Sequence, residues 1–198
     1  MVPTMAPEKL DLYKEHRDEY IAPREPTLVD VGPARYLAIT GRGKPGGPEF
    51  ANAVGALYTV SFTIKMTSKA AGSDYAVSKL EGVWWKEGAS VEWTWQLLIR
   101  VPEFITKKHL ADAVAKLMER DKDEMVARVT LETLDEGKCV QMLHIGPYTA
   151  EQPAIARMRA FAKQQGLSFR GRHHEIYLSD PRRVEEEKLR TILRQPVA

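Results

Sequence analysis

The sequence predicts an α+β fold, built as a tandem duplication of a strand-helix-strand-strand module with pseudo-twofold symmetry and a central ligand cleft. Two observations predict the duplication. The order strand, helix, strand, strand occurs twice in the 198 residues, once on each side of a central helix. The two units also end alike, with Leu-Ile-Arg-Val-Pro at 98–102 and Ile-Leu-Arg-Gln-Pro at 192–196. A crevice between two such modules is a natural ligand site.

The first module is expected at about residues 30–105, behind an N-terminal arm of residues 1–29 that contains a short helix. Apolar residues at helical spacing and Pro48 in the first turn predict its helix. The Gly- and Pro-rich loop before that helix matches neither a Walker nor a dinucleotide motif, and is expected to be a turn. The predicted elements are a strand at about 35–41, the loop at 41–48, the helix at 49–66 and strands at about 76–85 and 91–101.

A linker helix at 106–125, capped by Thr106, leads to the second module at about 126–198. Two strands around the turn Asp135-Glu136-Gly137-Lys138 are expected to form a hairpin. The predicted elements are the hairpin strands at 127–134 and 139–145, a helix at about 150–165, a strand at 173–178 and a final strand at 188–196.

Aromatic residues are concentrated in the first module. All four tryptophans fall within twelve positions, more than a small core needs, and flat aromatic walls commonly hold planar ligands. On the helix, Tyr58 and Phe62 either pack into the core or line a pocket. The tryptophans are Trp84, Trp85, Trp93 and Trp95.

Glu175 lies inside the most strand-like segment of the second half of the chain. Strand side chains alternate between faces, so Glu175 should share a face with His173 and Tyr177. An unpaired carboxylate in an apolar setting is costly or stays protonated. Glu175 therefore marks either an exposed sheet face or a functional site.

Composition excludes several classes of protein. With 29 basic and 27 acidic residues the net charge is +2, so no nucleic-acid-binding surface is expected. Cys139 is the single cysteine, which excludes an intrachain disulfide and a thiolate metal site. His173 and His174 should point to opposite faces, and no H-E-x-x-H motif is present, so neither a metal nor another cofactor is expected. A Ser-His-Asp triad stays open on composition alone, but no G-x-S-x-G motif supports one.

The N-terminal residues lack the features of a secretory signal, and no run reaches the length of a membrane span. We therefore expect a cytoplasmic protein with no membrane partner. A monomer is expected, although the sequence leaves the oligomeric state open.

Five segments together resemble the GyrI-like small-molecule-binding family, over roughly residues 8–198. The resemblance implies two strand-helix-strand-strand modules, a deep cleft with aromatic walls, and a buried glutamate that matches Glu175. The segments are Tyr36-Leu37-Ala38-Ile39-Thr40-Gly41, Leu80-Glu81-Gly82-Val83-Trp84-Trp85, Gln141-Met142-Leu143-His144-Ile145-Gly146-Pro147-Tyr148, residues 173–181 with His-His-Glu-Ile-Tyr, and Thr191-Ile192-Leu193-Arg194-Gln195-Pro196-Val197.

The resemblance also implies functions. Regulators of the family use the glutamate to attract bulky aromatic cations, whereas stand-alone members with the Trp-Trp segment look like hydrolases of cyclopropane-bearing, DNA-alkylating natural products. We therefore expect a metal-free hydrolase that adds water to planar aromatic genotoxins and so protects the cell. The first alternative is a non-catalytic multidrug-binding protein for planar or cationic aromatic compounds. The second is a gyrase-inhibitor-like interaction protein.

In the expected reaction Glu175 activates the water molecule as general base, and Tyr148 hydrogen-bonds the developing phenolate. Glu81 is either a second carboxylate of the site or an ion-pair partner of Lys79, and His144 is either a ligand contact or a core histidine. The expected substrate-binding residues are Tyr58, Phe62, Glu81, Trp84, Trp85, Trp95, His144 and Tyr177.

Overall fold

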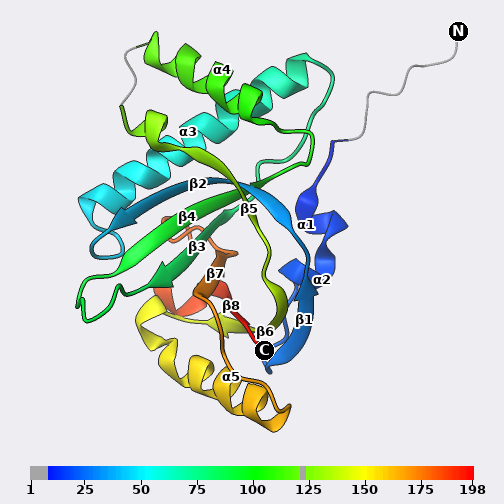
Figure 1. Cartoon of the computed structure of the whole chain (residues 1–198), viewed down its shortest axis with the longest axis vertical. Coiled ribbons are helices and arrows are strands. Elements are labelled where there is room, and N and C mark those ends of the chain that lie inside the picture. The colour runs from blue at the N-terminus through cyan, green and yellow to red at the C-terminus, as the bar shows by residue number, and fades with distance from the viewer. Residues whose placement is uncertain (1–8, 121–123) are drawn as a thin grey trace, which may run out of the picture.

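A computed structural model describes residues 9–120 and 124–198 and has one curled sheet of eight antiparallel strands with helices around it (Figure 1). The predicted α+β class is confirmed. The strand order is β1-β6-β8-β7-β3-β4-β2-β5. The strands are β1 (Thr27–Val31), β2 (Ala34–Arg42), β3 (Leu80–Trp85), β4 (Thr94–Val101), β5 (Thr130–Leu134), β6 (Gly137–Ile145), β7 (His173–Tyr177) and β8 (Arg190–Pro196).

The helices cover the sheet from two sides. One side, called the helix face below, carries the long helix α3 and, at the other end of the molecule, α5 (Figure 1). The opposite side, the arm face, is covered by the short helices α1 and α2 of the N-terminal arm. The helices are α1 (Leu12–Glu15), α2 (Arg17–Tyr20), α3 (Pro48–Ala70), α4 (Lys107–Met118) and α5 (Gln152–Gln164), with 3₁₀ turns at Glu124–Arg128, Tyr148–Ala150 and Glu186–Lys188.

The sheet order is symmetric about the β7–β3 pair. Outward from the centre, one side has β7, β8, β6 and β1, and the other has β3, β4, β2 and β5. This is the order that a duplicated strand-helix-strand-strand module would produce. The duplication itself, with its boundaries near residues 30, 105 and 126, stays a prediction. Residues 1–8 of the predicted arm and 121–123 of the predicted linker helix lie outside the described residues.

The predicted hairpin between β5 and β6 is wrong. β5 pairs with β2, from Ala34 opposite Leu134 to Ala38 opposite Thr130, and β6 pairs instead with β1, a strand that the sequence analysis missed. The side chain of Glu136, in the turn between β5 and β6, is buried and bound by Arg194 and His174. This burial turns the chain inward at the point where a hairpin would have folded back.

A buried ionic network holds the arm face together. His174 lies between two carboxylates, with Nε2 3.0 Å from Glu81 and Nδ1 3.0 Å from Glu136. A carboxylate oxygen 3.0 Å from each ring nitrogen favours the charged imidazolium. Arg194 binds Glu136 at 3.1 Å and also donates to the backbone carbonyl of Glu19, which ties the arm to the sheet. Glu81 also accepts a hydrogen bond from the hydroxyl of Tyr20 at 3.0 Å.

Candidate functional site

A chain of hydrogen bonds fixes Glu175 on the helix face. β7 alternates as predicted, with His174 fully buried on the arm face and Glu175 and Tyr177 on the helix face. The indole Nε1 of Trp84 donates to the Tyr177 hydroxyl at 3.0 Å, and that hydroxyl donates to Oε2 of Glu175 at 2.8 Å. Because the tyrosine proton is committed to Glu175, the carboxylate is held in one orientation beside two aromatic rings.

Gly82 makes room for this chain. It lies on β3 directly opposite Glu175. A Cβ at Gly82 would lie 2.8 Å from the Tyr177 hydroxyl and 3.0 Å from Nε1 of Trp84. Only glycine leaves the indole N–H of Trp84 free to reach the hydroxyl oxygen of Tyr177, so the site depends on a residue that has no side chain.

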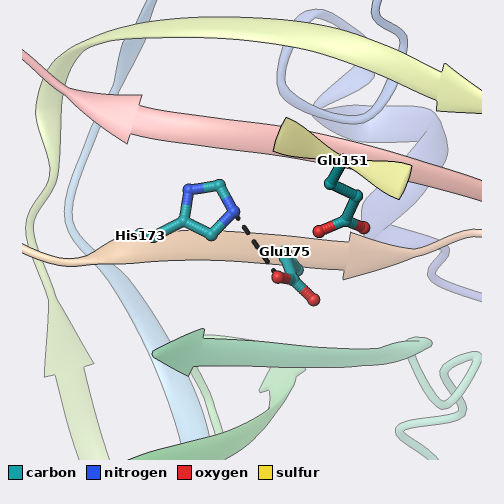
Figure 2. A group of neighbouring side chains, drawn as sticks. All are labelled: Glu151, His173 and Glu175. Atoms are coloured by element: carbon teal, nitrogen blue, oxygen red, sulfur yellow. Dashed lines mark ion pairs between the residues drawn. The ribbon is translucent and has the colours of Figure 1, made fainter. Parts of the chain in front are cut away.

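Two further residues meet Glu175, as Figure 2 shows: His173 from the same strand and Glu151 from the residue before α5. Nε2 of His173 lies 3.5 Å from Oε1 of Glu175. One nitrogen or oxygen atom from each of the three side chains lies within 4.8 Å of the other two. We call Glu151, His173 and Glu175 the carboxylate cluster.

Burial and mutual repulsion shift the protonation of this cluster. Burial, the charge of Glu175 and a hydrogen bond to it raise the pKa of Glu151 to about 9. Burial and the nearby charges of Glu175 and Glu151 raise the pKa of the Tyr148 hydroxyl to about 12. Tyr148 is therefore a neutral donor at physiological pH, and so is Tyr177, whose pKa is raised by burial and by the charge of Glu175.

Several predicted site residues gather here. Tyr148 is about one-third exposed, and its ring packs edge-on against Tyr177 at 5.6 Å. The ring of Trp84 stacks on Phe50 at 5.8 Å, and Trp93 meets it edge-on at 6.4 Å.

Three other predicted residues make contacts of their own. Tyr58 packs on the same core and stacks against Phe62, which points largely to solvent. A ring nitrogen of His144 lies 3.0 Å from the backbone carbonyl of Pro147, in the turn that carries Tyr148. The side chain of His144 therefore contacts the backbone of this turn.

Three predicted site residues do not reach Glu175. Glu81 and Trp85 alternate to the arm face, where Glu81 binds His174 and the ring of Trp85 lies under Arg172 at 3.6 Å. Two neighbours on one strand cannot both face the same ligand, so Trp84 and Trp85 do not form one clamp. Trp95 is on the helix face but fully buried, and a Cβ at Gly41 would clash with its ring.

The sequence analysis missed Glu151, Gly82 and the contact of Trp93. Trp93 could have been found, since it precedes Trp95 by two positions on a predicted strand. Glu151 has no such signal, because its place depends on how α5 packs on β6 and β8.

Two surface hollows are present, and neither is lined by a residue of the carboxylate cluster, although the second is lined by Ala150 and His144. One is lined by residues of β2, β4 and the start of α3, and the other lies between β6 and α5. Neither includes Glu175, so the predicted central cleft is not one of them. Glu175 is nevertheless reachable, because its side chain is 12% exposed and that of His173 is 19% exposed. None of the helices in the described ranges has the length and apolar character of a membrane span.

The family model of the GyrI-like small molecule binding domain matches residues 24–198. This chain belongs to the GyrI-like family. The match includes both halves of the sheet and every residue of the carboxylate cluster, so the chain is a small-molecule-binding domain. No curated protein matches the sequence.

Solved structures support the same assignment. An uncharacterised conserved protein from Listeria innocua is 38% identical, with a TM-score of 0.91, and the match covers 96% of this chain and 100% of that one. A protein described as a hydrolase from Listeria innocua is also 38% identical, with a TM-score of 0.88 and the same coverage. The EcmrR C-terminal domain shares the fold alone, at 10% identity and a TM-score of 0.57 over 88% of this chain and 97% of that one.

Proposed function

We propose that this protein is a hydrolase that adds water to the strained ring of cyclopropane-bearing planar aromatic compounds, with Glu175 as general base. The observation that carries the proposal is the fixed Glu175 carboxylate, which accepts the hydrogen bond of Tyr177 beside the ring of Trp84. The similarity to a Listeria innocua protein described as a hydrolase supports a hydrolytic reaction.

The chemistry requires little assistance, because a cyclopropane conjugated to a dienone is already electrophilic. Water attacks the ring methylene, and the bond between that methylene and the carbon shared with the dienone ring breaks. Its electron pair moves through the dienone to the oxygen as that six-membered ring becomes aromatic. Glu175 takes the proton of the attacking water, and the phenolate oxygen then regains a proton, so the net change is the addition of one water. General-base catalysis of this kind contributes roughly 10²–10⁴-fold.

The protein holds the substrate through its aromatic side chains. A flat ring system would stack against the partly exposed Tyr148 and reach the edge of the largely buried Trp84, while the neutral Tyr148 hydroxyl can donate to the developing phenolate. Tyr177 already donates to Glu175, so its role is to orient the base.

The test is incubation of pure protein with a neutral cyclopropane-bearing alkylator, followed by mass spectrometry. The expected product has gained the mass of one water. Glu175→Gln has the same shape but accepts no proton, so its single-turnover rate should fall at least ~10²-fold. Equal hydrolysis by both proteins would remove Glu175 from the mechanism.

A second function, binding of planar or cationic aromatic compounds without chemistry, is favoured by one observation. No lysine or arginine in the described part of the chain forms an ion pair with Glu175, so its charge is available to a ligand cation. If this function is right, Glu175→Gln should lower the affinity for cationic ligands and leave the affinity for neutral ligands unchanged. Neither protein should yield the hydrated product.

A further inference from the structure

Two carboxyl groups meet in the site without a cationic side chain to separate them. Glu151 is 6% exposed, and within residues 9–120 and 124–198 neither it nor Glu175 forms an ion pair with a lysine or arginine. Two buried like charges in contact are strongly unfavourable unless a proton or a cation is added. The lysines and arginines of the described ranges therefore leave this carboxyl pair without a compensating charge, and the imidazole of His173, 3.5 Å from Glu175, is the one basic group of the cluster.

The hydrogen bonding of Glu151 shows where that charge belongs. Its Oε1 atom is buried and has no hydrogen-bond donor among the residues that the structure describes. Its carboxyl also does not cap α5, because no side-chain cap bond is formed and Pro153 in the first turn lacks an N–H. An ionised carboxylate at this position would leave a buried acceptor unsatisfied, whereas a protonated one donates to Glu175.

We propose that Glu151 holds a proton at neutral pH and shares it with Glu175, so that the cluster presents a single anionic carboxylate. Glu151 is then a positioning residue: its O–H and that of Tyr177 hold Glu175 from two sides. The role of Glu151 in catalysis rests on the proposed function, but the shared proton does not.

The groups around the pair are few. From β7 come Glu175, His173 and Tyr177, and from the turn before α5 comes Tyr148. Asp180, after β7, helps to raise the pKa of Tyr148. Glu175 is the one charged group that acts on Glu151, and together with burial it raises the pKa of Glu151 to about 9. Above that pH both carboxyls are charged and repel each other.

The first experiment measures the proton without any substrate. Protein labelled with ¹³C at the glutamate carboxyl carbons is titrated by NMR, and the resonance of Glu151 is assigned by its loss in Glu151→Gln. We expect that resonance to stay in the protonated position at pH 7 and to titrate near pH 9. Titration near the ordinary value of about 4.5 would overturn the proposal. So would a protonated resonance that appears only after a chelator is added, because a metal ion would then hold the pair.

The second experiment measures the consequence for activity. Glu151→Gln imitates the protonated acid, since its amide can donate to Glu175, so it should keep the hydrolysis rate at pH 7 within about 3-fold. If the hydrolysis rate of the unmodified protein declines near pH 9, the rate of Glu151→Gln should not decline there. Glu151→Leu, which cannot donate, should lower the rate at least 10-fold at pH 7.

A rate for Glu151→Gln as low as that of Glu151→Leu would overturn the positioning role. If the unmodified protein hydrolyses nothing, the proposed function fails, and the NMR titration still decides whether the proton is shared.

Discussion

Gly82 faces Glu175 across the β3–β7 ladder, and its missing side chain lets the indole of Trp84 reach the hydroxyl of Tyr177. β3 therefore leaves the space that the site needs, and its neighbour β7 provides the carboxylate of Glu175. Since β3 and β7 are the central strands of the sheet, one from each half, the candidate site lies on the line where the two halves join.

The first prediction concerns that space. Gly82→Ala should push Tyr177 and Trp84 apart, because a Cβ would lie within 3.0 Å of both polar atoms. We expect a loss of about 1–3 kcal/mol in the free energy of unfolding, as for other overpacked cores. Ligand affinity should also fall. Chemical denaturation and a binding titration measure the two effects.

The matched control is Gly55→Ala, on the exposed side of α3 with nothing within 4 Å of the added carbon. It should stabilise the protein by about 0.5–1 kcal/mol, because alanine is the better helix former. Equal stability of Gly82→Ala and the parent protein would show that the Trp84–Tyr177 contact tolerates a side chain.

The second prediction separates the adjacent tryptophans. Trp84 is on the helix face beside Tyr177, and Trp85 is on the arm face under Arg172. Trp84→Ala should lower the affinity for a planar aromatic ligand roughly 3- to 10-fold, which corresponds to the free energy of one aromatic contact. Trp85→Ala should change affinity less than about 2-fold. Dissociation constants measured by ligand fluorescence test this difference. An effect of Trp85→Ala as large as that of Trp84→Ala would contradict the assignment of the two side chains to opposite faces.

The third prediction concerns the arm. Tyr20→Phe removes the hydroxyl that donates to Glu81 at 3.0 Å and leaves a buried carboxylate short of one donor. We expect a loss of about 1–3 kcal/mol in the free energy of unfolding. The control is Tyr13→Phe, because Tyr13 stacks on Tyr20 at 3.8 Å but its buried hydroxyl has no partner. Urea denaturation should show little change for the control, and equal losses would mean that the hydrogen bond to Glu81 contributes nothing.

The sequence predicted local features of the site better than its long-range contacts. Strand alternation is enough to put Glu175 and Tyr177 on one face, and the same rule applied to β3 separates Trp84 from Trp85. That β5 pairs with β2 rather than with β6 is set by contacts between strands about 90 residues apart, for which the local turn signal at 135–138 carries no information. Likewise, nothing near Glu151 marks it as buried, since β7 supplies the group that it meets.

The fourth prediction follows from the charge of His174. Burial alone would lower the pKa of this imidazole, but contacts with Glu136 and Glu81 raise it to about 9, against 6.5 in a solvated chain. Because the folded state binds the proton more tightly, the stabilisation is complete below pH 6.5 and is lost as the pH rises to about 9. The contribution of His174 to this loss should be on the order of 3 kcal/mol. Thermal unfolding of Glu151→Gln between pH 6 and pH 9.5 measures it, because the parallel contribution of Glu151 is absent there.

Two variants identify the group responsible for this loss. Glu151 also loses a proton near pH 9, but its destabilising effect begins near pH 4.5, where an unfolded glutamate ionises. Glu151→Gln should therefore remove the decline between pH 4.5 and 6.5 and leave the contribution of His174 above it. His174→Gln should be less stable at pH 6 by several kcal/mol, because Glu81 and Glu136 lose their shared cation, and its remaining pH dependence should be shallower above pH 6.5. A decline of unchanged steepness in His174→Gln would show that His174 is neutral in the folded protein.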